Sequence, residues 1–261
     1  LYFKNGGEAD TPIITDIQAL DTRFERKQDS VYARFAAPGE FVLNHHVGSP
    51  CAANDYQPLR TTLPHKTTKR IATSGGRGSN SDWPYFNVEW PGEGVIAVVG
   101  WPGQWAATFT RDEANGLRVE AGQEQTHFKL LPGEEVRTPL VVLQFWKGDR
   151  VRSQNTFRRW MLAHNVPQPG GQPIQPMLVG CSSHFTQEMV DANEEKQIRV
   201  INRYLEERLR IDYWWMDAGW YPCDGNWTKT GTWEVDLKRF PRGLGGISDH
   251  AHFKGIKTIV C

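Results

Sequence analysis

Hydrophobic residues in the first 150 positions occur in short runs that are separated by glycine, proline, asparagine and aspartate. Residues 95–99 and 140–146 are the clearest of these runs, and each has the length of a single strand. Long helical periodicity is lacking in this part of the chain. The pattern predicts a β-sandwich, whose strands bury one side against a shared core and are joined by tight turns. A short helix is expected at about residues 155–164.

A segment rich in proline and glycine follows. It contains Pro167, Pro169, Gly170, Gly171 and Pro173. Proline lacks the backbone N–H that helices and central strands need, and glycine weakens both elements. We therefore predict a β-sandwich domain over residues 1–165, a linker over 166–175 and a second domain over 176–261.

The pattern changes after this segment. Apolar runs at residues 177–179, 211–216 and 256–260 predict three strands, and stretches with helical spacing lie between them. The order β-α-β-α-β, with strands about forty residues apart, favours parallel strands joined by crossover helices. Such strands occur in barrels and in doubly wound open sheets, and periodicity alone does not separate the two.

Both connecting helices have recognisable ends. Asp191 and Glu194 are placed to form a capping pair at the first helix. Its apolar stripe, which should lie on the sheet, contains Ile198, Ile201, Leu205 and Leu209. The second helix is predicted from about Leu244 through Ile247 and Ala251, and Gly255 is able to stop it in a left-handed conformation.

Charge and composition narrow the class of ligand. Thirty Lys and Arg residues balance thirty Asp and Glu residues, so the formal net charge is zero. This balance gives no support to nucleic acid, an anionic membrane or a polyacidic partner, and a neutral small molecule is expected. Eleven Trp, seven Tyr and twelve Phe residues suit the apolar faces of sugar rings, although core packing explains most of them.

Neither a metal site nor a disulfide framework is predicted. The four cysteines match no zinc or redox spacing, and they are Cys51, Cys181, Cys223 and Cys261. Two histidine pairs are interpreted as structural or solvated because their side chains converge poorly on one ion. These pairs are His45 with His46 and His250 with His252.

The ends of the sequence suggest a piece of a longer protein. The chain begins without Met on what reads as a strand, and it ends on the apolar residues Ile259, Val260 and Cys261. No run approaches the roughly 18 apolar residues that span a bilayer, and the first residues lack the regions of a signal peptide. The compartment stays open, with a secreted or periplasmic location favoured over a cytoplasmic one, and a homo-oligomer is also left open.

Asp217 is the clearest candidate for a ligand-binding residue. The apolar run 211–216 ends at this acid, and Trp220 follows shortly after. Side chains at the carboxyl ends of parallel strands are held rigidly at the edge where active sites form. A carboxylate there can accept hydrogen bonds from sugar hydroxyls while the indole covers an apolar ring face. Position alone does not separate this role from a structural one. Asp217 could equally cap a loop, and Trp220 could equally be a packing residue.

Three segments, taken in order, resemble glycoside hydrolase family 36, the group of α-galactosidases and raffinose-synthase relatives. Residues 217–221 resemble its Asp-Asp-Gly-Trp-Phe signature at the end of the second barrel strand. Residues 231–244 resemble its Gly-Asp-Trp and Phe/Leu-Pro-x-Gly-Leu stretch, and residues 255–261 resemble the strand that leads into Trp-Phe-Glu-Pro-Glu. Residues 11–13 and 101–105 resemble the family's N-terminal domain more loosely.

The resemblance implies an N-terminal β-supersandwich followed by the first strands of a (β/α)8 barrel. It also implies a retaining exo-hydrolase for terminal α-linked galactose-type sugars, which needs two carboxyls about 5 to 5.5 Å apart and no cofactor. In the family both carboxyls come from the fourth and sixth barrel strands, so they are expected after Cys261 and none is assigned in this chain. The family counterpart of Asp217 binds sugar hydroxyls.

Departures from the family pattern bear on specificity. Ala218 replaces the second acid of the Asp-Asp pair, which removes one partner for a sugar hydroxyl. Ser182 and Cys261 stand near positions where the family has large pocket tryptophans, so the site is expected to be roomier. The added space would suit a substituent such as an acetamido group, as in an N-acetylgalactosaminide, or a differently linked sugar. Trp233, in the loop after the second strand, is a candidate to stack on the sugar, although pinning its own loop is the commoner role of such a residue.

Two other functions use the same residues. A raffinose-synthase-like transglycosylase would pass the sugar to another sugar hydroxyl instead of water. A noncatalytic carbohydrate-binding homologue would keep the recognition edge without the acid pair. In each case the expected partner is an oligosaccharide or glycan.

Overall fold

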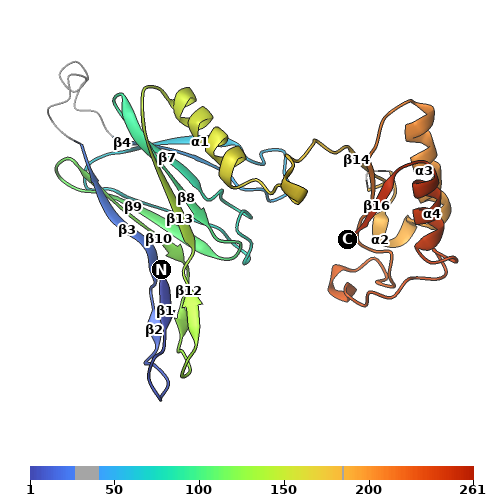
Figure 1. Cartoon of the computed structure of the whole chain (residues 1–261), viewed down its shortest axis with the longest axis horizontal. Coiled ribbons are helices and arrows are strands. Elements are labelled where there is room, and N and C mark those ends of the chain that lie inside the picture. The colour runs from blue at the N-terminus through green and yellow to red at the C-terminus, as the bar shows by residue number, and fades with distance from the viewer. Residues whose placement is uncertain (27–40, 184) are drawn as a thin grey trace. The chain divides into compact units, whose positions relative to one another are not determined.

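The computed structural model describes residues 1–26, 41–183 and 185–261 (Figure 1). The chain divides into two compact units, Leu1–Val166 and Pro167–Cys261. Each unit has its own hydrophobic core.

Unit 1 is built from two antiparallel sheets. The first has the strand order β3-β10-β9-β6 and the second has the order β13-β8-β7-β4-β5. The strands of the first sheet are β3 Gln18–Glu25, β6 Thr68–Ala72, β9 Trp105–Arg111 and β10 Gly116–Gln123. Those of the second are β4 Phe41–His46, β5 Pro58–Leu63, β7 Tyr85–Trp90, β8 Glu93–Gly100 and β13 Leu140–Lys147. The runs at 95–99 and 140–146 are thus confirmed as strands.

The two sheets share one core because alternate residues of their strands point inward. In β9 the side chains of Trp105, Ala107 and Phe109 are fully buried, and the residues between them are partly exposed. Phe86 of the second sheet lies 5.7 Å from Trp105 and 5.1 Å from Phe109, measured between ring centroids. Both contacts are edge-to-face, the geometry that aromatic pairs prefer.

Two small ladders extend unit 1 away from its sheets (Figure 1). One pairs β1 Tyr2–Lys4 with β12 Glu135–Arg137, and the other pairs β2 Ile14–Thr15 with β11 His127–Phe128. All four strands have two or three residues, so these arms bury little surface.

Helix α1, Arg150–His164, packs on the five-stranded sheet of unit 1 (Figure 1). It begins at Arg150 rather than near residue 155 because Asp149 caps it, accepting a hydrogen bond from the Arg152 N–H at 2.7 Å. The Asn87 amide joins sheet and helix, since it donates to Ser153 Oγ and accepts from Trp146 Nε1, both at 2.9 Å.

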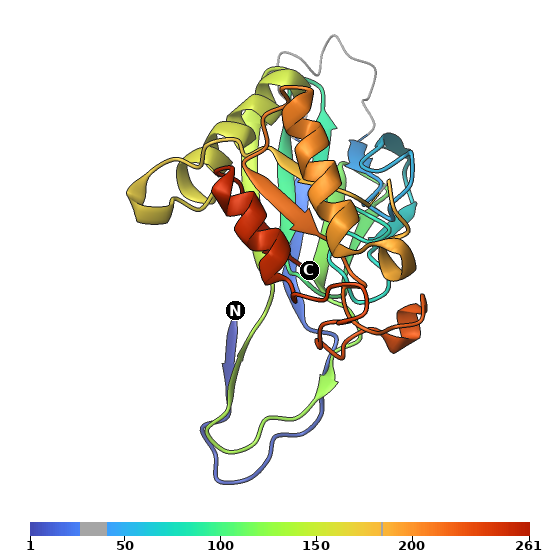
Figure 2. The same ribbon diagram turned by 90° about the vertical axis from the view of Figure 1, so that its right-hand side faces the viewer.

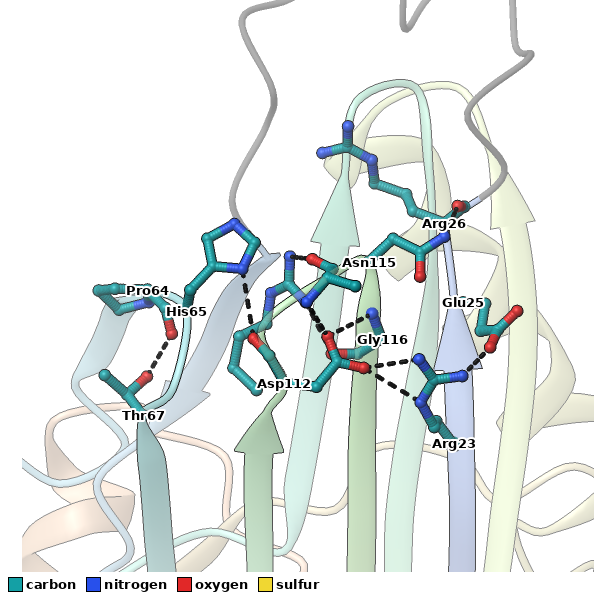
Figure 3. Close-up of polar contacts among 11 residues, drawn as sticks. Arg23, Glu25, Arg26, Pro64, His65, Thr67, Asp112, Asn115 and Gly116 are labelled. Atoms are coloured by element: carbon teal, nitrogen blue, oxygen red, sulfur yellow. Dashed lines mark hydrogen bonds and ion pairs between the residues drawn. The ribbon is translucent and has the colours of Figure 1, made fainter.

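A polar network closes the turn between β9 and β10 (Figure 3). Asp112 accepts hydrogen bonds from Arg23 and from the backbone N–H groups of Ala114 and Gly116. Desolvation acts to raise the pKa of Asp112, but the Arg23 guanidinium and these N–H groups together lower it to about 2. The carboxylate therefore stays charged and fixes the turn.

Unit 2 has the order β-α-β-α-β that the sequence predicts. Strands β14 Val179–Cys181, β15 Tyr213–Met216 and β16 Lys257–Val260 form a parallel sheet with β15 in the centre. The helices are α2 Glu188–Asp191, α3 Glu194–Glu206 and α4 Gly245–Phe253, with short 3-10 turns at Pro169–Gly171 and Trp227–Lys229. Gly255, at φ +76°, ends the α4 segment in the left-handed region as expected.

Helices α3 and α4 lie side by side on the sheet (Figure 2). The core beneath them contains Ile201, Trp214 and Ile247, each 0% exposed. Trp215, the next residue of the central strand, points to the other face and is 43% exposed. One face of the sheet is therefore covered by helices, and the other carries exposed apolar residues.

The predicted cap of α3 is wrong. Asn193, not Asp191, occupies the N-cap, and its side chain accepts from the Lys196 N–H at 2.9 Å. Asp191 instead ends α2 and pairs with the Lys196 ammonium. Leu209 lies beyond α3 and is 54% exposed, so it is not part of the helix's buried stripe.

Candidate functional site

Asp217 lies directly after β15, at the carboxyl end of the central strand, and is partly buried. Its Oδ1 accepts from the Ala218 N–H at 2.8 Å, and its Oδ2 accepts from Ser183 Oγ at 3.2 Å. A carboxylate has about four lone-pair sites, so these two bonds orient Asp217 and leave acceptor capacity for a ligand. The arrangement suits recognition of hydroxyl groups.

Ser183 was not singled out in the sequence, although strand register explains its position. Cys181 pairs with Trp215 in the parallel ladder, and two further residues along each strand bring Ser183 opposite Asp217. Alternation alone could have placed residues 181 and 183 on the same side as 215 and 217.

Ser182 faces the opposite way and is 1% exposed. Its hydroxyl donates to Glu188 Oε1 at 2.6 Å and accepts from Gln197 Nε2 at 2.8 Å. Gln197 in turn accepts from Trp214 Nε1 at 2.8 Å. The Ser182 hydroxyl is thus engaged in a buried network that joins β14, α3 and β15.

Three aromatic residues from the segments that follow Asp217 in the chain form a cluster. Trp220 is 9% exposed, lies 5.0 Å from Tyr221 and 6.0 Å from Trp233 between ring centroids, and donates from Nε1 to the Cys261 carbonyl at 2.8 Å. Trp233 is 63% exposed and has a positive φ of 56°, which is uncommon for a bulky residue. Of the two tryptophans singled out in the sequence, Trp233 therefore presents the open ring, while Trp220 is packed beneath it.

Cys261 is exposed and follows β16. Its backbone N–H donates to the Met216 carbonyl at 3.0 Å, just before Asp217. The Trp220 indole and the β15 backbone thus fix the Cys261 backbone at the same end of the sheet as Asp217.

A turn at residues 236–239 holds the backbone around Trp220. The Arg239 guanidinium donates to the carbonyls of Gly219 and Tyr221, the latter at 3.1 Å. The Asp236 N–H donates to the Trp220 carbonyl at 3.0 Å. Three consecutive carbonyls are therefore bound by this turn, which we name the 236–239 clasp.

Arg239 has further partners within unit 2. It donates to the carbonyls of Glu188 and Ala192 at 3.3 and 3.1 Å, and it pairs with Asp236 Oδ2 at 2.8 Å. This pairing lowers the pKa of Asp236 below its ordinary value. Sequence reasoning missed Arg239, and only the carbonyls that it meets reveal its role.

No group of three or more His, Cys, Asp and Glu side chains is placed to hold a metal ion in the described parts of the chain. His250 Nε2 lies 2.8 Å from Asn202 Oδ1, an ordinary structural contact. Across the same residues, no helix is long and apolar enough to cross a membrane.

The chain was compared with protein families, curated proteins and solved structures, and curated α-galactosidases are similar to it. No family model matches the chain. Among curated proteins, it is 26% identical over 172 residues to α-galactosidase Mel36A of Lactobacillus acidophilus, covering 65% of the chain and 23% of that protein. It is 24% identical over 215 residues to α-galactosidase 1 of Pediococcus pentosaceus, covering 78% of the chain and 28% of that protein. The chain is thus similar in sequence to curated α-galactosidases.

Solved α-galactosidase structures have a fold similar to that of this chain. The GH36 α-galactosidase AgaA of Geobacillus stearothermophilus has a TM-score of 0.79 at 18% identity, over 99% of this chain and 34% of that one. The galactosidase domain of the α-galactosidase–sucrose kinase AgaSK has a TM-score of 0.78 over the same shares. The chain spans about a quarter of the length of the curated relatives that it matches.

Proposed function

We propose that the whole protein is a retaining exo-glycoside hydrolase for terminal α-linked galactose-type sugars, and that this chain supplies part of its sugar-recognition edge. One observation carries the proposal: Asp217, partly buried and oriented by Ser183, lies at the carboxyl end of a central parallel strand. That edge is where α/β folds bind small molecules. The α-galactosidase names of the relatives support the same activity.

The proposal includes a domain assignment. We place an N-terminal β-supersandwich at residues 1–165, a linker at 166–175 and the start of a (β/α)8 barrel at 176–261. The uncovered face of the parallel sheet supports the barrel, because parallel strands are buried on both faces in known folds. Trp215 and Ile259 are 43% and 37% exposed on strands β15 and β16, and the interior of a closed barrel would cover them.

The chemistry follows from the two-carboxylate mechanism. One carboxyl attacks the anomeric carbon, and the other protonates the leaving oxygen and then activates water, so no cofactor is needed. We assign neither role to a residue of this chain. Asp217 would accept hydrogen bonds from sugar hydroxyls, and the exposed ring of Trp233 would lie against an apolar sugar face.

The specificity proposal rests on volume at this edge. The exposed Cys261 is smaller than the tryptophan that the family has at this position. We propose that this space admits an acetamido group. Turnover of an aryl α-galactoside and an aryl α-N-acetylgalactosaminide by the whole protein should be compared. A strong preference for the unsubstituted sugar would contradict this part of the proposal.

The recognition role is tested by Asp217→Asn in the whole protein. A charge-assisted hydrogen bond to a ligand contributes about 1.5–3 kcal/mol, so kcat/KM for the aryl glycoside should fall about 10- to 100-fold. Asp224→Asn is the matched control, because Asp224 is an exposed acid in the following loop that pairs with Lys229. Activity of Asp217→Asn within about twofold of the unchanged protein would refute the role.

Transglycosylation is the second candidate. The exposed ring of Trp233 favours it, because an open aromatic face beside the donor site can hold an acceptor sugar. Products formed with and without a sugar acceptor distinguish transfer from hydrolysis, and a protein with neither activity that still binds galactose is a carbohydrate-binding homologue.

A further inference from the structure

We propose that Ser183 is a second sugar-contacting residue, and that Ser183 and Asp217 together bind two neighbouring hydroxyl groups of one sugar. This inference rests on the proposed function, because it takes the ligand at the carboxyl end of β15 to be a saccharide. It goes beyond that function by assigning to Ser183 a hydrogen bond with the ligand itself, in addition to the one that orients Asp217.

The side chain of Ser183 lies on the face of the parallel sheet that the helices leave uncovered. Cys181 pairs with Trp215 in the ladder between β14 and β15, and Trp215 is 43% exposed on that face. Strand alternation puts residue 183 on the same side of the sheet as residue 181. Ser183 and Asp217 are both half-buried. A ligand at this edge can therefore reach both side chains.

The backbone before Ser183 is fixed, so the hydroxyl has a defined position. The Ser182 carbonyl accepts from the backbone N–H groups of Phe185 and Thr186 at 2.8 and 2.9 Å. The Ser182 side chain points to the opposite face and is held in the buried network that joins β14, α3 and β15. A side chain whose neighbours are already fixed loses little conformational entropy when it binds a ligand.

The Ser183 hydroxyl keeps the capacity to accept hydrogen bonds. A serine hydroxyl has one donor and two acceptor lone pairs, and the donor of Ser183 is directed at Asp217 Oδ2 at 3.2 Å. Among the residues that the structure describes, no group donates to Ser183 Oγ. A hydroxyl that donates a hydrogen bond is polarised, so its oxygen becomes a stronger acceptor. Both lone pairs of Ser183 are thus open to a ligand.

The spacing of the two acceptors identifies the kind of ligand. Asp217 Oδ2 and Ser183 Oγ are 3.2 Å apart. A hydroxyl oxygen lies about 2.7–2.8 Å from its acceptor, so two donors that bind these atoms must be close to each other. Neighbouring hydroxyl groups of one sugar meet this condition. Because both protein atoms accept, a ligand that carries only acceptors, such as a carboxylate, would not fit.

The test is the binding of methyl α-galactopyranoside and its 2-, 3-, 4- and 6-deoxy analogues to the whole protein, measured by isothermal titration calorimetry. Ser183→Ala should weaken binding of the parent sugar about three- to tenfold, through the loss of one hydrogen bond. One deoxy analogue should bind the unchanged protein and Ser183→Ala equally, because it lacks the hydroxyl that Ser183 binds. Asp217→Asn should have its smallest effect on an analogue that lacks a neighbouring hydroxyl.

Two further variants separate hydrogen bonding from side-chain shape. Ser183→Thr keeps the hydroxyl and should bind the parent sugar within about twofold of the unchanged protein. Ser183→Cys keeps the size of the side chain but offers only a weak acceptor, so it should reproduce the pattern of Ser183→Ala. Ser74→Ala is the matched control, because Ser74 is an exposed serine of unit 1 whose hydroxyl accepts from Asn80 at 3.2 Å. It should leave every affinity unchanged.

Three results would overturn the proposal. The first is an equal loss for Ser183→Ala with the parent sugar and with every analogue, which would leave Ser183 only the task of orienting Asp217. The second is a single analogue that abolishes the effects of both Ser183→Ala and Asp217→Asn, which would mean that the two residues share one hydroxyl. The third is the absence of binding to any of these sugars at about 20 mM, a concentration above the millimolar range of weak binding.

Hydrolysis of an aryl α-galactoside is measured separately, so this inference and the proposed function can fail independently. The expected pattern of binding without turnover would reject the hydrolase and keep the assignment of Ser183. Turnover combined with an equal loss across the analogues would reject the assignment of Ser183 and keep the hydrolase.

Discussion

Two adjacent serines after β14 have opposite surroundings. Ser183 donates to Asp217, and Ser182 is buried against Glu188 and Gln197. Strand alternation causes the difference, since neighbouring side chains point to opposite faces of a sheet. A change at residue 183 should therefore affect ligand recognition, and a change at 182 should affect folding.

Gln197 is the centre of the buried network and is 1% exposed. Gln197→Met keeps the volume but leaves Trp214 Nε1 and Ser182 Oγ without this partner. Unpaired buried polar groups cost about 1–3 kcal/mol each, so the free energy of unfolding should fall by about 2–4 kcal/mol. Urea denaturation followed by tryptophan fluorescence measures the loss. The exposed Gln187→Met is the control, and an equal loss in both variants would contradict the network's role.

At this scale the sequence predicts positions better than contacts. Asp217 at a strand end follows from an apolar run that stops at an acid. The burial of Trp220 and the contact between Ser183 and Asp217 depend on register and on the 236–239 clasp, which bring together residues distant in the chain. No local pattern contains that information.

Helix α3 offers a direct comparison of two capping residues. Asn193→Ala removes the side chain that accepts from the Lys196 N–H and should lower the free energy of unfolding by about 1 kcal/mol. Asp191→Ala should have a smaller effect, because its partner is a side chain and Asp191 is 50% exposed. Thermal unfolding of both variants shows which substitution lowers stability more. A larger loss of stability for Asp191→Ala would support the capping pair of Asp191 and Glu194 that the sequence predicts.

The 236–239 clasp should position Trp220 without contacting a ligand. Arg239→Lys has one ammonium in place of a planar guanidinium and cannot reach four carbonyls at once. We expect a weaker near-ultraviolet circular dichroism signal from the Trp220, Tyr221 and Trp233 cluster, and a KM raised several-fold with a smaller change in kcat. Arg203→Lys, in which the arginine is 67% exposed, is the control. An unchanged dichroism signal and KM would exclude the positioning role.

Helices and strands were predictable where hydrophobic residues recur at a clear period. Examples are the strands at 95–99 and 140–146 and the order of strands and helices in unit 2. Helix starts were less predictable because they depend on single side-chain contacts. Asp149 and Asn193 each cap a helix that the apolar pattern alone placed differently.

The stability of the molecule should depend on pH through His45. Burial lowers the pKa of His45 to about 4, and the nearby charges of Lys69 and His46 act in the same direction. The unfolded chain, with a pKa near 6.5, binds a proton more readily between about pH 6.5 and 4, so stability falls as the pH falls through this window.

The expected loss reaches about 3 kcal/mol near pH 4. Urea denaturation at pH 7 and at pH 4.5 measures it, and His45→Gln should reduce the difference between the two conditions. His127→Gln, at an exposed position, should not. An equal pH dependence in the unchanged protein and in His45→Gln would show that another group is responsible.

At the scale of the whole chain, two kinds of hydrophobic pattern distinguish the two units. Short alternating runs gave the antiparallel sheets of unit 1, and alternating strand and helix patterns gave the parallel sheet of unit 2. A barrel and an open sheet share these local patterns, because they differ only in which strands meet at their edges. Such long-range pairing is not written in local spacing, and the likeness of the chain to an α-galactosidase structure, at a TM-score of 0.79, is a likeness of fold that these patterns alone do not give.

Gly219 constrains how new specificities can arise. It adopts φ +97°, and an added Cβ would lie 2.5 Å from the Met189 Cα. A side chain at this position would displace the loop from the Met189 backbone. The backbone conformation of Gly219 therefore fixes the spacing between Asp217 and Trp220. Directed evolution of this edge should therefore accumulate changes at facing positions such as 183 and 261, while position 219 stays glycine in the surviving library members.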